Sequence, residues 1–223
     1  MAALVLPRPC LMLVTDRTLV GGGDGLVEAV AAAVEGGVNA VQLREKDLAP
    51  TDLARLAVRL HKALRVRGTI GGRALLIVNG NADVAREVAA DGLHLPADAP
   101  FARPAGVALV GRSVHSVEAA VKAEREGAAY VIAGPIYETR SHRGAAAEGV
   151  RLISAVVGAV SVPVVAIGGI TAARVPDVLS AGAGGVAVIS AVLGAKSPIA
   201  AACALREALD AVPLRARRAA VER

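Results

Sequence analysis

The sequence has few aromatic residues, few cysteines and no long uninterrupted apolar run. Its 223 residues include no Trp, two Tyr and one Phe, so aromatic platforms for base stacking are lacking and single-stranded nucleic-acid binding is not expected. Cys10 and Cys203 lie far apart, which excludes a closely spaced zinc or redox pair. We expect both to be buried in a protein of the reducing cytoplasm. Glycines and charges interrupt every apolar stretch, so no membrane partner is expected.

The length of the chain suits one (β/α)8 barrel, and we expect a single domain over residues 1–223. The net charge of +5 comes with arginines spread along the chain and a local concentration at the C-terminus in Arg215, Arg217, Arg218 and Arg223. This pattern predicts a basic, flexible tail from about residue 212, with a nucleic-acid contact as the less favoured alternative.

Apolar runs alternate with segments of helical periodicity. The runs predict strands at 11–15, 40–44, 74–79, 92–95, 107–113, 129–134, 164–168 and 185–189. Helices are predicted at 26–35, 51–67, 82–90, 117–126, 150–157, 172–181 and 198–209, with a short or missing helix in the proline-rich segment 96–106. A doubly wound open sheet would alternate similarly, but eight strand–helix units in this length favour an α/β TIM barrel.

The last two predicted strands end in small residues that leave backbone N–H groups open. In a closed parallel barrel, the loops after the seventh and eighth strands form the usual phosphate site. We therefore expect Gly168, Gly169, Ile189 and Ser190 to bind a phosphate, largely through backbone N–H groups. The alternative is that the glycines only permit tight turns.

Charged and polar side chains follow the other predicted strands. Arg44 and Lys46 suit the carboxylate or phosphate of an anionic ligand. The alternative is a loop whose charges are satisfied internally, with Glu45 pairing with a neighbour. Asn79 before a glycine is also an ordinary turn signal, and we expect His94 to be packed and hydrogen bonded.

His115 lies between a predicted strand and a helix for which Ser116 is the expected N-cap. Its imidazole suits proton transfer near neutral pH, and the alternative is a structural histidine. The polar loop 134–144 is suited to closing over a substrate or is simply solvated. No nucleophile triad, close carboxylate pair or metal-ligand spacing stands out, so we expect neither a hydrolase nor a metal or other cofactor.

Taken together, these strand ends resemble the thiamine phosphate synthase superfamily over about 11–209. The matching segments, in order, are Gln42-Leu43-Arg44-Glu45-Lys46, Ser113-Val114-His115-Ser116, Gly134-Pro135-Ile136-Tyr137, Ala166-Ile167-Gly168-Gly169-Ile170 and Val188-Ile189-Ser190. The resemblance implies a barrel fold and a phosphorylated thiazole or pyrimidine ligand from thiamine biosynthesis.

The superfamily contains synthases and thiazole tautomerases of the TenI branch. In synthases an Asp that holds magnesium follows the Asn of the third strand, where this chain has Gly80. Ala99 stands at a second magnesium position, with Asp98 one residue early, and a pyrophosphate-binding Lys is replaced within 139–142. Losing a carboxylate beside a doubly charged metal is a large electrostatic loss, so pyrophosphate displacement is not expected.

The resemblance therefore favours a thiazole tautomerase, an isomerase that forms the aromatic ring of a carboxythiazole phosphate, with His115 as proton shuttle. The substrate-binding residues expected with it are Arg44, Lys46, Asn79, Ser113, Gly134 and Glu138. Because Gln42 and Lys46 look more like the synthase branch, thiamine phosphate synthase is the first alternative. A non-catalytic regulatory binder of thiazole phosphate is the second. The expected partners are thiazole phosphate, the upstream thiazole synthase and, through the outer helices, a second copy of the chain.

Overall fold

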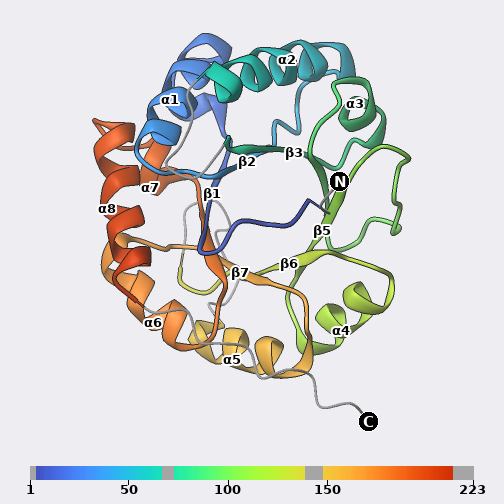
Figure 1. Ribbon diagram of the computed structural model, residues 1–223, viewed down its shortest axis with the longest axis vertical. Coiled ribbons are helices and arrows are strands. Elements are labelled where there is room, and N and C mark those ends of the chain that lie inside the picture. Colours follow the sequence, from blue (N-terminus) through green and yellow to red (C-terminus); the bar gives the residue numbers. More distant parts are fainter. Residues whose placement is uncertain (1–3, 67–72, 139–147, 213–223) are drawn as a thin grey trace.

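A computed structural model describes residues 4–66, 73–138 and 148–212 of the chain. Its strands form one closed parallel barrel in sequence order, with β8 hydrogen bonded to β1 (Figure 1). The strands are β1 Cys10–Val14, β2 Ala40–Leu43, β3 Leu75–Asn79, β4 Gly92–Leu95, β5 Leu109–Val114, β6 Tyr130–Ala133, β7 Val164–Ile167 and β8 Gly185–Val188. The predicted TIM barrel is confirmed, because each apolar run became a strand.

Helices surround the barrel on its outside (Figure 1). They are α1 Gly23–Glu35, α2 Pro50–Val66, α3 Ala82–Glu87, α4 Val117–Arg125, α5 Gly149–Ala159, α6 Val175–Ser180, α7 Ser190–Leu193 and α8 Pro198–Asp210, with 3-10 turns η1 Arg17–Leu19 and η3 Ala172–Arg174. No helix lies between β4 and β5, as the proline-rich segment predicted. Within the described ranges, no helix is both long enough and apolar enough to cross a bilayer.

The helices differ from the predictions in detail, and the helix predicted at 82–90 ends at Glu87. The segment 172–181 is not one helix but η3 followed by α6, because Pro176 lacks an N–H and is tolerated only in a first helical turn. The four-residue helix α7 was not predicted, since it is too short to show a helical period. It places a helix N-terminus directly after β8.

The core has two layers because side chains alternate across each strand. In β1, Leu11 and Leu13 pack against the helices, while Cys10 and Met12 point into the barrel interior. Burial raises the pKa of the Cys10 thiol to about 12. Cys203 in α8 is only half-buried, so the expectation of two buried cysteines is confirmed for Cys10 alone.

Apolar side chains fill the barrel interior toward the N-terminal ends of the strands. Leu6 packs there with the inward residues of β1, β3 and β5, and Tyr130 of β6 is fully buried among them. The aromatic ring occupies the space beside Gly111, its partner in β5, where an added Cβ would lie 2.1 Å from Tyr130 Cζ. Because this part of the interior is filled, a ligand can bind only at the C-terminal ends of the strands.

Candidate active site

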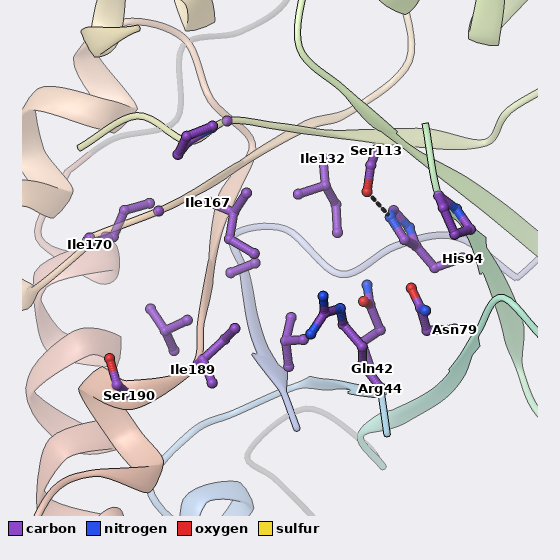
Figure 2. A pocket seen from close by; sticks show the side chains of 18 of the residues that line it. Gln42, Arg44, Asn79, His94, Ser113, Ile132, Ile167, Ile170, Ile189 and Ser190 are labelled. Atoms are coloured by element: carbon purple, nitrogen blue, oxygen red, sulfur yellow. Dashed lines mark hydrogen bonds between the residues drawn. The ribbon is translucent and has the colours of Figure 1, made fainter. Parts of the chain in front are cut away.

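A cavity of about 480 Å³ opens at the C-terminal ends of the strands. Every strand of the barrel, or the loop directly after it, contributes to its wall, from Val14 at the end of β1 to Ser190 after β8 (Figure 2). Ile132, Ile167 and Ile170 give the wall an apolar part. The size and the mixture of apolar walls with a few polar groups are typical of a small-molecule site.

Backbone groups after β7 and β8 form one wall of this cavity. Gly168 and Gly169 have φ angles of +107° and +61°, which favour glycine, and a Cβ on Gly169 would lie 2.5 Å from the carbonyl oxygen of Glu138. Ile189 is the N-cap of α7 and Ser190 its first residue. The N–H groups of this first turn have no acceptor within the helix. All four residues expected to bind phosphate therefore lie together in the cavity wall.

Successive side chains at the end of β2 point in alternate directions, and this alternation places two cationic groups in the cavity. Gln42, Arg44 and Lys46 line it. Glu45 and Asp47 instead bind Arg17 of η1, with Nη1 of Arg17 3.0 Å from Glu45 and Nη2 2.6 Å from Asp47.

The alternative interpretation of this loop was therefore only half correct. Glu45 is buried and does pair with an arginine, but that arginine comes from another loop. Hydrogen bonds from Arg17 lower the pKa of Asp47 to about 2. Neither Arg44 nor Lys46 forms an ion pair with a described residue, so both cations are available to a ligand.

His94 of β4 is buried and hydrogen bonded, as expected, and it also reaches the cavity wall. Its Nε2 lies 2.9 Å from Oγ of Ser113, the contact drawn in Figure 2, and its Nδ1 lies 3.2 Å from the hydroxyl of Tyr130. Burial, assisted by the positive charge of Arg44, lowers the pKa of His94 to about 3. The imidazole is therefore neutral at physiological pH.

His115 lies at the cavity mouth with an exposed side chain. Its Nδ1–H donates to the carbonyl oxygen of Gly134 at 2.5 Å, so the other ring nitrogen, Nε2, remains for a ligand. Ser116 caps α4 as predicted, accepting from the N–H of Ala119 at 3.1 Å. The cap and the carbonyl contact together hold the imidazole at the rim.

Asn79 and Gly134 also line the cavity, whereas Glu138 does not. The side chain of Glu138 is exposed and is not part of the cavity wall, and its expected contact with substrate stays a prediction. The rest of the expected lid, including 139–142, lies outside the described residues.

Two residues that support the site from outside the cavity, Tyr130 and Arg17, were not anticipated, and neither was Ile132 in its wall. Gly111 inside a strand was a signal for Tyr130, because an interior glycine marks close approach of another group. Nothing in the local sequence distinguished Arg17 from other surface arginines.

Comparison with known proteins identifies the family. The family model described as thiamine monophosphate synthase matches residues 11–192, from β1 to α7. The chain belongs to this family. A thiamine-phosphate synthase of Methanoculleus marisnigri is 43% identical over 208 residues, covering 90% of this chain and 95% of that protein. One of Desulfitobacterium hafniense is 39% identical, covering 88% of this chain and 95% of that protein.

Solved structures agree with the family assignment. A thiamine phosphate pyrophosphorylase of Pyrococcus furiosus superposes with a TM-score of 0.78 at 34% identity, covering 91% of this chain and 96% of that one. A 3-hexulose-6-phosphate synthase, at 21% identity and a TM-score of 0.68, shows the barrel fold alone.

These relatives overturn the expectation of a thiazole tautomerase and of an isomerase. Relatives with 35–43% identity are named thiamine-phosphate synthase. The expectation gave too much weight to the missing carboxylates at Gly80 and Ala99. Mg²⁺ is commonly held by one or two carboxylates together with substrate phosphates, and Asp98 still lines the cavity, so these two losses do not exclude a synthase. The chain is an enzyme of the synthase family within thiamine biosynthesis.

Proposed function

We propose that the protein is a thiamine-phosphate synthase, a transferase that joins a pyrimidine diphosphate to a thiazole phosphate. The observation that carries the proposal is a single cavity with two distinct groups for binding anions. The backbone groups around Gly168 and Ser190 form one, and the side chains of Arg44 and Lys46 form the other. A reaction between two phosphorylated substrates requires both groups at once.

The two anionic groups of the substrates are assigned by chemistry. The backbone N–H groups at Gly168, Gly169, Ile189 and Ser190 suit the monophosphate of the thiazole. The diphosphate faces Arg44 and Lys46. A thiazole ring nitrogen attacks the methylene carbon of the pyrimidine; the C–N bond forms, the C–O bond breaks, and diphosphate leaves with the electron pair. The two cations stabilise the negative charge that develops on it.

The synthase branch implies Mg²⁺ at the diphosphate, and the donor set of the cavity fits it in part. Asp98 is the one carboxylate among the described cavity residues, and Asn79 supplies an amide oxygen. No cluster of three metal-ligating side chains occurs in the described ranges. Asp98 with Asn79 would therefore hold Mg²⁺ only in a site completed by substrate phosphates. When bound, the ion would neutralise the leaving diphosphate.

His115, Ser113 and Gly134 complete the proposed contacts with the substrates. Because diphosphate displacement transfers no proton in the bond-forming step, we assign His115 to substrate binding through Nε2 rather than to a proton shuttle. The apolar side chains of Ile132, Ile167 and Ile170 pack against the aromatic rings and exclude water from the reacting atoms.

The experiment is a direct assay of thiamine phosphate and diphosphate formation from the two substrates with Mg²⁺. Lys46→Met should lower kcat/KM about 10- to 100-fold, since a hydrogen bond to a charged group contributes about 1.5–3 kcal/mol. Lys62→Met removes the same charge from the exposed surface of α2, away from the cavity, and should leave the rate unchanged. No product from the wild-type protein, or equal rates for both variants, would contradict the proposal.

A further inference from the structure

The hydroxyl of Tyr130 and the imidazole of His94 form a polar pair inside the largely apolar barrel interior. Tyr130 is 0% and His94 1% exposed, so bulk water does not compete for their polar atoms. The pair continues to Ser113, whose Oγ lies 2.9 Å from Nε2 of His94 and which lines the cavity (Figure 2). Three side chains thus connect the buried interior to the ligand site.

The direction of the hydrogen bonds in this chain follows from Tyr130. Its hydroxyl has Nδ1 of His94, at 3.2 Å, as its one hydrogen-bonding partner among the described residues. A buried O–H left without an acceptor costs about 1–3 kcal/mol, so the hydroxyl donates to Nδ1. The ring nitrogens of the buried His94 contact only two hydroxyls, and no carboxylate of the described residues pairs with them, so the ring carries one proton, which must then be on Nε2. The Nε2–H therefore donates to Oγ of Ser113.

We propose that Tyr130 and His94 are positioning residues that turn the hydroxyl of Ser113 toward the cavity, where it donates to a phosphate oxygen of the bound substrate. With the opposite direction, Ser113 would donate to His94 and present only lone pairs to an anion. The inference rests on the proposed function for its phosphorylated ligand. The test of the inference measures ligand binding and needs no turnover, so the inference and the proposed function can fail separately.

The geometry of Tyr130 allows a clean test. Its ring fills the space beside Gly111, so Tyr130→Phe keeps the packing and removes only the O–H. The chain has one other tyrosine, Tyr137. Its ring lies under the guanidinium of Arg174 at 4.4 Å, and it does not line the cavity. Tyr137→Phe is therefore the matched control for loss of a tyrosine hydroxyl.

The first experiment measures binding of inorganic phosphate and of inorganic diphosphate by calorimetry, in separate arms. Ser113→Ala should weaken the binding of one of the two anions about 10-fold, and the anion affected shows which phosphate group Ser113 contacts. Tyr130→Phe should weaken the binding of the same anion about 3- to 10-fold. The double variant should be no weaker than Ser113→Ala, because Tyr130 acts through Ser113. Tyr137→Phe should bind as the wild type does.

Additive losses in the double variant, wild-type affinity in Tyr130→Phe, or an unchanged affinity of Ser113→Ala for both anions would each overturn the proposal. A second experiment needs no variant. Nitrogen-15 NMR of the histidine side chains in the wild-type protein should show His94 with a protonated Nε2 and an unprotonated Nδ1. The opposite tautomer would overturn the proposal even if Tyr130→Phe failed to fold. Binding without turnover would support it while contradicting the synthase activity.

Discussion

Gly80 is the residue at which this chain departs most clearly from the synthase pattern. It follows Asn79 of β3 with a φ angle of +72°, and the only atoms that an added Cβ would meet are in Pro96, at 3.9 and 4.0 Å. The position therefore has room for a side chain. The cost is backbone strain, which is about 1 kcal/mol or somewhat more for a non-glycine residue in the left-handed region.

Gly80→Asp should restore the carboxylate that the synthase branch uses for Mg²⁺. We expect the Mg²⁺ concentration for half-maximal activity to fall several-fold, because a second carboxylate strengthens a site otherwise built from Asp98 and substrate phosphates. Gly80→Asn has the same size and the same tolerance for this φ, but no charge. An equal Mg²⁺ requirement in titrations of the two variants would show that the position does not contact the ion.

At the scale of elements, the loops after β1 and β2 support each other. Arg17 of η1 binds both acidic residues that follow β2, and this leaves the cations of the same segment facing the cavity. Residue types alone predicted a mixed-charge loop with two open interpretations. The choice between them depended on a contact across 28 residues of sequence, which no local pattern contains.

Arg17→Met tests this arrangement of elements. The substitution leaves the buried carboxylate of Glu45 unpaired, and it should lower the free energy of unfolding by about 2–4 kcal/mol. It should also weaken diphosphate binding, because Glu45 and Asp47 are released to attract Arg44 and Lys46. The control Arg55→Met breaks an exposed pair with Asp52 and should cost less than about 1 kcal/mol. Similar urea denaturation midpoints for the two variants would contradict the support role.

At the scale of the whole molecule, the buried His94 couples stability to pH. Its pKa is about 3 in the folded protein and near 6.5 when exposed, so the unfolded state takes up a proton that the folded state does not. The stability due to the neutral imidazole is complete above pH 6.5 and is lost as the pH falls toward 3.

Urea unfolding should therefore show this loss between pH 7 and pH 5. We expect about 2 kcal/mol from His94, at 1.36 kcal/mol per pH unit below its unfolded pKa. His94→Gln has no titrating group at this position, and its unfolding free energy should change less over the same range. The same pH dependence in both proteins would show that His94 does not couple stability to pH.

The sequence by itself determined the barrel, the placement of its strands and the four residues, Gly168, Gly169, Ile189 and Ser190, that lie together in one wall of the cavity. Strand alternation and small residues after two successive strands are local features, and the fold brings all strand ends to one edge. It also contained the family resemblance, although three departures from the synthase pattern led to the wrong branch.

Only the tertiary structure decided which charges face the ligand and how the interior reaches the cavity. Arg17 meets Glu45 across 28 residues, and Tyr130 meets His94 across 36. Such contacts depend on barrel closure and on which side chain fills the space beside a glycine. The physical reason is that hydrogen-bond direction and charge pairing are set by neighbours in space, and most of these neighbours are distant in the chain.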